Sequence, residues 1–156
     1  MHDGAELDWL IKLWMSKGGI PWRNRKVAFD KTIATMTVYM EASGEGPEGM
    51  LAVAYVLRNR LAKPLTFGVT LAAVCLKPSQ FSCWNTTDPN RQRMATVPDG
   101  DEIMAQANDA VTAASAGTQP DPTLGALYYF ADGIAKPYWA NALSMTVKIG
   151  KQTFYK

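Results

Sequence analysis

Three glutamates lie within eight residues of one another, and their type and spacing suggest catalysis more than any other group in this sequence. They are Glu41, Glu45 and Glu48, in the stretch Y-M-E-A-S-G-E-G-P-E-G-M-L-A-V-A-Y-V-L-R-N-R at residues 39–60. The apolar flanks and central glycines predict the end of one helix, a tight turn and the start of a second helix. A carboxylate where a buried helix meets a turn is partly desolvated, which raises its pKa and makes it a usable general acid. Because Glu41 directly follows the apolar segment, we expect it to be that acid.

The other two glutamates carry different expectations. Proline is favoured at the first position of a helix, so we expect Pro47 there in the second helix. Glu48 then takes the second position, where a carboxylate interacts favourably with the positive, N-terminal end of the helix dipole. That structural role is sufficient for Glu48. Glu45 follows Glu41 by four residues, but Gly44 between them makes helical spacing unreliable. Glu45 is therefore either a solvated residue near the helix start or a second or supporting carboxylate. A catalytic pair would be separated by about 5 Å in a retaining enzyme and by roughly 6.5–9.5 Å in an inverting one.

Other common hydrolytic chemistries lack their residues. The single histidine, His2, lies near the N-terminus, whereas zinc hydrolases usually need two imidazoles or several thiolates. Ser-His-Asp and Cys-His hydrolases need a positioned histidine base. Cys75 and Cys83 cannot supply the missing ligands, and no phosphate-binding or dinucleotide-binding glycine motif is present. Carboxylate chemistry remains, and we expect neither a metal nor a cofactor.

Residues 78–85, P-S-Q-F-S-C-W-N, combine side chains that suit sugar binding. Amides and hydroxyls can bind sugar hydroxyls, and an indole can pack on the apolar face of a sugar ring. The candidate contacts are Gln80, Phe81, Ser82, Trp84 and Asn85. The alternative is a surface loop that Phe81 and Trp84 anchor in the core.

Tyr128 and Tyr129 lie in A-L-Y-Y-F, residues 126–130, which predicts a short strand or extended wall. Neighbouring side chains in a strand point to opposite faces, so one tyrosine faces the core and the other can line a cleft. Cys75 and Cys83 are eight residues apart, and a disulfide is geometrically possible. A chain made in the cytoplasm usually keeps its thiols reduced, so we expect buried free cysteines.

The elements that must position these residues are mostly helices. Helical periodicity and capping residues predict helices over residues 5–17, from about 23 to 43, 48–61, 71–76 after Thr70, and about 101–116 before Gly117. In the second of these, Phe29, Ile33, Met36 and Met40 form an apolar stripe. Alternation on either side of Gly150-Lys151 predicts a C-terminal hairpin. The fold class is therefore mainly α (α+β) with a small C-terminal β-hairpin.

Composition limits the partners and the compartment. A chain of 156 residues with 47% hydrophobic and 19% charged residues can form one soluble domain. A net charge of +2 gives no field that would favour a nucleic acid. No signal peptide is expected, because Glu6 and Asp8 precede the first apolar run. The helix at 5–17 either packs on the core or is an amphipathic segment that touches a membrane or partner.

Four separated motifs in this order resemble the spore cortex-lytic (SleB-like) cell-wall hydrolase family. They are E-A-S-G-E-G-P-E-G-M-L-A-V-A-Y-V-L-R-N-R, Q-F-S-C-W-N, G-A-L-Y-Y-F and T-V-K-I-G-K-Q-T-F-Y-K. The resemblance implies a lysozyme-like catalytic domain at residues 23–156, with residues 1–22 as an N-terminal extension. It places the catalytic acid/base at Glu41. Ser43 stands where the family often has arginine, which could alter substrate binding.

The implied substrate is peptidoglycan. The resemblance implies a lytic transglycosylase that cleaves between N-acetylmuramic acid and N-acetylglucosamine and leaves a 1,6-anhydro sugar, with a hydrolytic muramidase as the close alternative. An N-acetylmuramoyl-L-alanine amidase and an inactive wall-binding module stay open as other classes. The resemblance also suggests a monomeric phage endolysin that is synthesised in the host cytoplasm and reaches the wall once the membrane is permeabilised.

Overall fold

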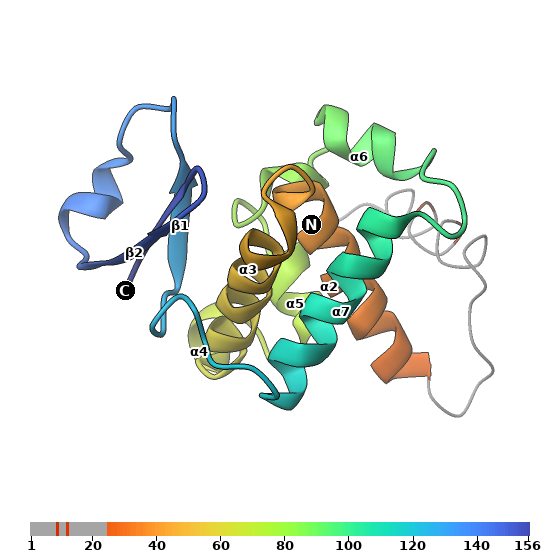
Figure 1. Ribbon diagram of the computed structural model, residues 1–156, viewed down its shortest axis with the longest axis horizontal. Helices are drawn as coiled ribbons and strands as arrows, with labels where there is room; N and C mark the ends of the chain where they lie inside the picture. The colour runs from red at the N-terminus through yellow and green to blue at the C-terminus, as the bar shows by residue number, and fades with distance from the viewer. Residues whose placement is uncertain (1–8, 10–11, 13–24) are drawn as a thin grey trace.

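The computed structural model describes Trp9, Lys12 and residues 25–156, which form a mainly helical domain with one small β-sheet (Figure 1). The α-helices are α2 (Arg25–Ala42), α3 (Gly46–Leu61), α4 (Pro64–Phe67), α5 (Leu71–Leu76), α6 (Pro89–Met94) and α7 (Glu102–Ala116). Short 3-10 helices span Ser82–Trp84 and Tyr138–Asn141, and the strands are β1 (Tyr128–Ala131), β2 (Met145–Ile149) and β3 (Gln152–Tyr155). The predicted mainly α class is confirmed. Apart from Trp9 and Lys12, the predicted extension at residues 1–22 lies outside the described residues.

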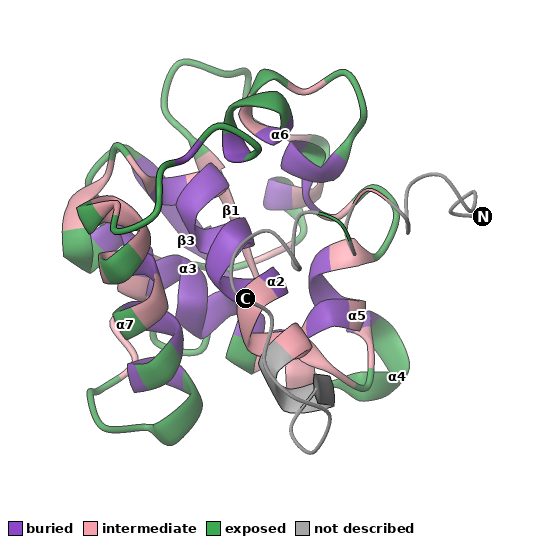
Figure 2. Cartoon of the chain, turned by 90° about the vertical axis from the view of Figure 1, so that its right-hand side faces the viewer, coloured by how far each residue is buried: buried purple, intermediate pink, exposed green. Residues whose placement is uncertain are grey.

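Helices α2, α3 and α7 pack against one another and enclose the main hydrophobic core (Figure 2). The second helix of the Glu41 stretch is central, since Met50 and Val53 of α3 are 0% exposed. In α2 the whole run 33–40 is buried, which is more than the single predicted stripe. Even Thr37 is 0% exposed, because α2 lies against α3, α5 and α7.

Most predicted helix ends are confirmed by their hydrogen bonds. Thr70 Oγ1 accepts the amide three residues later at 3.1 Å, and Asp101 Oδ1 does the same at 2.8 Å. Gly117 ends α7 with a left-handed φ of 67°, which glycine adopts without steric cost. α3 begins at Gly46, one residue before Pro47, which was predicted at the first position, so Pro47 lies second in the helix.

The sheet is antiparallel, in the order β1-β3-β2. The predicted hairpin is confirmed as β2–β3, and the predicted extended segment at 126–130 contributes β1 on the other side of β3. A small second core joins the sheet to α3, and it consists of Ala52, Val56, Ala126, Ile149 and Phe154. In Figure 1 the sheet therefore stands beside α3, away from α7.

Cys75 and Cys83 are both free and buried, which confirms the expectation of reduced core thiols over a disulfide. Within the described part of the chain, every helix is too short or too polar to cross a membrane.

Candidate active site

Glu41 lies in the last turn of α2, where the helix meets the first strand of the sheet. The Tyr129 hydroxyl donates a hydrogen bond of 2.6 Å to Glu41 Oε2. The two residues are 88 positions apart in the sequence, so the fold alone brings them together. A phenol on a carboxylate at this distance is a charge-assisted hydrogen bond, which is stronger than a bond between neutral groups. Glu41 is thus a half-buried carboxylate with one oxygen held by the sheet.

The groups around Glu41 keep their protons. Burial raises the pKa of Tyr129 well above its ordinary value, and the charge and hydrogen bond of Glu41 raise it further. Burial likewise raises the pKa of the Cys83 thiol, with further contributions from the charge and hydrogen bond of Glu41. Both groups stay neutral at neutral pH, so Tyr129 remains a hydrogen-bond donor whichever form Glu41 takes.

Two more hydrogen bonds join the Glu41 turn to the sheet. The Gln152 side chain donates to the Glu41 carbonyl at 3.3 Å, and the Lys151 amide donates to Glu45 Oε2 at 3.0 Å. A Cβ at Gly150 would lie 2.6 Å from Glu45 Oε2, so a larger residue here would displace the Glu45 carboxylate from the hairpin. Glu45 therefore binds the tip of the hairpin, which is a structural connection between α3 and the sheet.

Ser43 lies on the turn between α2 and α3. Its Oγ accepts a hydrogen bond of 2.9 Å from Arg93 of α6, and the Arg93 guanidinium lies 5.7 Å from the ring centroid of Tyr39. A guanidinium therefore reaches this turn from another helix, although the sequence has serine where the resembled family often has arginine. The sequence did not reveal this contact, because the two residues are 50 positions apart.

The aromatic residues of the 78–85 segment are core residues. Phe81 is 5% exposed and Trp84 is 6% exposed, and Trp84 Nε1 donates to Thr37 Oγ1 at 3.0 Å. The predicted sugar contacts of these two rings therefore find no exposed ring face. The alternative of a loop anchored in the core describes both residues, because the buried Thr37 hydroxyl provides the partner that a buried indole N–H requires. Ser82 and Asn85 are exposed and Gln80 is half-buried, so their sugar contacts stay predictions.

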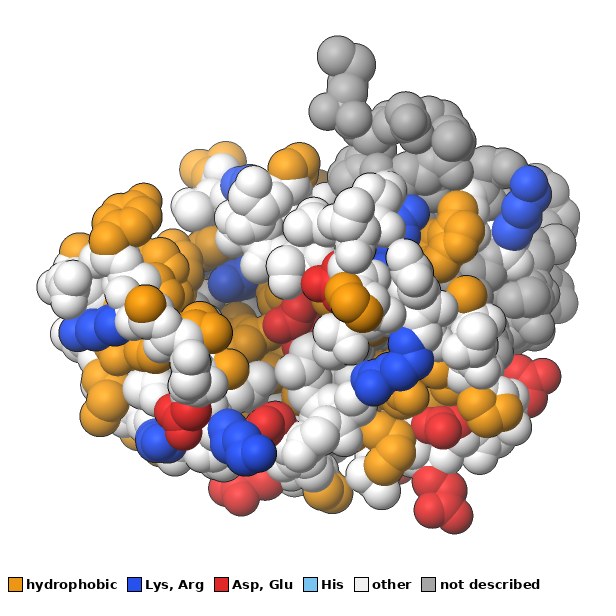
Figure 3. Space-filling view, turned by 90° about the horizontal axis from the view of Figure 1, so that it is seen from above, with side chains coloured by type: hydrophobic (Ala, Val, Ile, Leu, Met, Phe, Trp, Pro, Cys, Tyr) orange, Lys and Arg blue, Asp and Glu red, His pale blue; other side chains and the backbone are white. Residues whose placement is uncertain are grey.

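Tyr128 belongs to an aromatic cluster on the sheet, while Tyr129 points to Glu41. The Tyr128 ring lies 5.9 Å from that of Phe67 and 5.4 Å from that of Trp139, between ring centroids. Phe130 and Tyr155 extend the cluster. The surface is hollowed between the sheet and the helices, and hydrophobic, acidic and basic side chains are visible within the hollow (Figure 3). Such a groove suits a polymer that has both apolar and hydroxyl-bearing faces.

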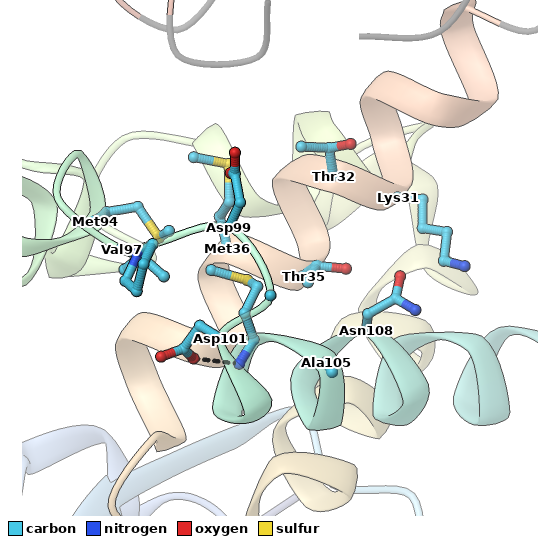
Figure 4. Close-up of a pocket in the computed structure, with 13 residues that line it drawn as sticks. Lys31, Thr32, Thr35, Met36, Met94, Val97, Asp99, Asp101, Ala105 and Asn108 are labelled. Atoms are coloured by element: carbon cyan, nitrogen blue, oxygen red, sulfur yellow. Dashed lines mark hydrogen bonds between the residues drawn. The ribbon is translucent and has the colours of Figure 1, made fainter. Parts of the chain in front are cut away.

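A different pocket, of about 500 Å³, lies between α2, α7 and residues 97–101 (Figure 4). Met36, Met94 and Met104 line it together with Thr35 and Asn108. It contains none of the residues that the sequence singled out as a candidate site, and Glu41 does not line it. Across the described residues, no three His, Cys, Asp or Glu side chains gather as they would to hold a metal ion.

Known proteins match this chain in both sequence and fold. A family model described as Cell Wall Hydrolase matches residues 44–155. The spore cortex-lytic enzyme of Bacillus subtilis is 34% identical over 127 residues, which are 80% of this chain and 37% of the relative. That of Oceanobacillus iheyensis is 34% identical over 144 residues, 89% of this chain and 47% of the relative. The chain thus spans less than half the length of these curated relatives.

Two solved structures are similar. The catalytic domain of the Bacillus cereus SleB protein has a TM-score of 0.64 and 31% identity, covering 81% of this chain and 89% of that one. The catalytic domain of the germination-specific lytic transglycosylase SleB from Bacillus anthracis has a TM-score of 0.65 and 30% identity, covering 88% of this chain and 100% of that one. These likenesses confirm the predicted lysozyme-like fold.

Proposed function

The chain belongs to the cell wall hydrolase family, and on that premise we propose that it cleaves peptidoglycan between N-acetylmuramic acid and N-acetylglucosamine with Glu41 as acid and base. The observation that carries the proposal is the 2.6 Å hydrogen bond from Tyr129 of β1 to Glu41 in the last turn of α2. It provides one carboxylate with a fixed orientation and a permanent donor. The name of the Bacillus anthracis structure, a lytic transglycosylase, supports the same reaction class.

The reaction needs two proton transfers by one group. Protonated Glu41 gives its proton to the glycosidic oxygen as the C1–O bond breaks, and the N-acetyl group of the substrate stabilises the oxocarbenium-like centre. The Glu41 carboxylate then takes the proton of the C6 hydroxyl as that oxygen attacks C1, which forms the 1,6-anhydro ring. Tyr129 stabilises the carboxylate between these steps because it remains protonated throughout.

The second carboxylate of the turn is not required. The nucleophile is part of the substrate, so neither a water molecule nor a second protein carboxylate has to be positioned for the attack. The bond between Glu45 and the Lys151 amide gives Glu45 a structural role and supports the one-carboxylate mechanism over a two-carboxylate muramidase. Glu45 then acts as a supporting residue, through the position of the hairpin.

Mass spectrometry of digested peptidoglycan tests the proposal. Anhydro-muropeptides are expected from the wild type. Reducing-end muramic acid would instead show a muramidase, freed peptides an amidase, and intact but bound wall an inactive wall-binding module. Glu41→Gln should lower the rate by about 10³-fold, because general acid–base catalysis typically contributes 10²–10⁴-fold. Glu48→Gln is the matched control, since this exposed carboxylate lies in the same stretch and should keep full activity.

We also propose the setting of an endolysin, made in the cytoplasm and acting as a monomer on the wall. Its support is the resemblance to a catalytic domain that cleaves wall glycan. Expression inside bacteria should leave culture turbidity unchanged until a membrane-permeabilising agent is added, and should then cause lysis. Lysis without permeabilisation would contradict this setting and leave the bond specificity as proposed.

A further inference from the structure

Arg60, in the last turn of α3, is a buried cation that has no carboxylate partner in the part of the chain that the structure describes. The residue is 5% exposed, and its Nε donates to the Leu127 carbonyl at 2.7 Å. Its Nη1 is buried and makes no hydrogen bond. Among the described residues no carboxylate lies within ion-pair distance of the guanidinium. Burying an unpaired charge costs several kcal/mol in general, so a fold keeps such a group most readily where it serves the site.

Aromatic rings supply part of the compensation. The Arg60 Cζ lies 4.8 Å from the ring centroid of Phe81, 5.2 Å from that of Phe67 and 5.6 Å from that of Tyr128. These distances are within the range of favourable cation–π contacts. Burial lowers the pKa of Arg60, and electrostatic interactions with Tyr129, Tyr128, Cys75 and Glu41 act in the opposite direction.

We propose that Arg60 is a positioning residue for Glu41, an inference that rests on the proposed function. Its bond to Leu127 fixes the chain two residues before Tyr129, so that the phenol reaches the Glu41 carboxylate. Its buried positive charge stabilises the carboxylate form of Glu41, which is the form that must take the proton of the C6 hydroxyl. The first effect is geometric and the second electrostatic, so different variants can separate them.

The other groups that face Glu41 are neutral. They are Tyr129 from β1, Cys83 from the 3-10 segment and Cys75 from α5. Burial is the largest influence on each, and it raises the pKa of all three. At neutral pH, Arg60 is therefore the charged member of this set, and its removal should favour the protonated form of Glu41. Since the first step needs protonated Glu41, the alkaline limb of the activity profile should then move to higher pH.

Two substitutions at Arg60 separate position from charge. Arg60→Met keeps the unbranched aliphatic stem of the side chain and removes both the charge and the hydrogen bond to Leu127. It should lower kcat by about 10–100-fold with little change in KM, the scale expected for a misplaced catalytic group. It should also move the alkaline limb up by about one pH unit, the scale of a buried charge nearby. Arg60→Lys keeps a charge but loses the Nε–H that donates to the Leu127 carbonyl, so kcat should fall while the limb stays in place.

Arg58→Met is the matched control, because Arg58 lies in the same helical turn but is exposed and packs over Tyr55. It should change neither kcat nor the limb. The proposal is overturned if the limb of Arg60→Met coincides with that of the wild type, or if Arg58→Met moves it equally.

A measurement on the wild-type protein covers the case in which Arg60→Met does not fold. The ¹⁵Nε signal of Arg60 should shift with the same pH midpoint as the ¹³C carboxyl signal of Glu41, and this step should vanish in Glu41→Gln. If the ¹⁵Nε shift of Arg60 does not change as Glu41 titrates, the electrostatic half of the proposal is overturned. Because this readout needs no substrate, it separates a failure of the proposed function, seen as no anhydro product, from a failure of the role of Arg60.

Discussion

The helical body and the sheet contribute unequally to stability and to the candidate site. The helical body has a large apolar core shared by α2, α3, α5 and α7. The sheet is joined to α3 by a second core of five buried residues, and Tyr128 and Tyr129 also pack against the main core. Side-chain hydrogen bonds connect the sheet to the Glu41 turn. Apolar burial stabilises in proportion to the area removed from water, so the helical body carries most of the folding free energy. The sheet positions Tyr129 against Glu41 and contributes the smaller part of the folding free energy.

This difference separates two kinds of substitution. A change at the sheet edge of the site should reduce activity much more than stability, because few buried contacts are lost there. A change in the helical core should reduce stability and leave the rate at neutral pH nearly intact. The predictions below test this separation from both sides.

The largest effect beyond Glu41 and Arg60 is expected from Tyr129→Phe. Phenylalanine keeps the ring, which lies 5.5 Å from that of Phe154 between centroids, and removes the hydrogen bond to Glu41. We expect kcat to fall by about 10–100-fold, since a charge-assisted hydrogen bond is worth roughly 1.5–3 kcal/mol. The free energy of unfolding should fall by no more than about 3 kcal/mol, the upper end of that range. Steady-state rates on soluble glycan fragments and urea unfolding measure the two quantities.

Tyr128→Phe is the matched control, because Tyr128 is the neighbour on the same strand and packs in the aromatic cluster. It should keep most of the activity. If Tyr129→Phe retained full activity, the phenol would have no part in catalysis. A large loss of stability in the same variant would contradict the proposed division between sheet and helices.

Local signals in the sequence predicted Glu41, the turn after it and the caps of the helices, because short-range chemistry decides them. The sequence could not identify Tyr129 as the hydrogen-bond partner of Glu41, because the distance between Tyr129 and α2 depends on how the sheet packs on α3. Trp84 shows a different limit. The residues around Trp84 in the sequence suit a buried indole and a sugar-binding indole equally well. Only the structure distinguishes the two, by the burial of Trp84 and its hydrogen bond to Thr37. Arg58 and Arg60 both lie at the end of a largely apolar helix, so the sequence could not show which of the two is buried.

A smaller effect is expected at Glu45, which links the two regions at the hairpin. Glu45→Gln keeps an oxygen acceptor for the Lys151 amide, so we expect a loss of only about two- to fivefold in kcat. Glu45→Ala removes the acceptor and should cost more activity, together with about 1 kcal/mol of stability. The same digestion assay and urea unfolding compare the two variants. Complete loss of activity in Glu45→Gln would instead indicate a second catalytic carboxylate and a muramidase-like mechanism.

The smallest effect on activity, and a clear one on stability, is expected from Cys75 in the helical core. Burial raises the pKa of this thiol from 9.0 to about 12. Between these values the unfolded chain releases the proton and the folded chain keeps it, so the free energy of unfolding should fall as pH rises above 9. The loss should be about 1.4 kcal/mol per pH unit for each such thiol. Cys83 and Tyr129, whose pKa values burial also raises, act in the same direction.

Urea unfolding at pH 7 to 10.5 should therefore show a shallower decline in the free energy of unfolding for Cys75→Ala than for the wild type, while both cleave glycan at similar rates at pH 7. Equal slopes for Cys75→Ala and the wild type would mean that this thiol does not ionise on unfolding. A lower rate of glycan cleavage by Cys75→Ala at pH 7 would show that Cys75 contributes to catalysis.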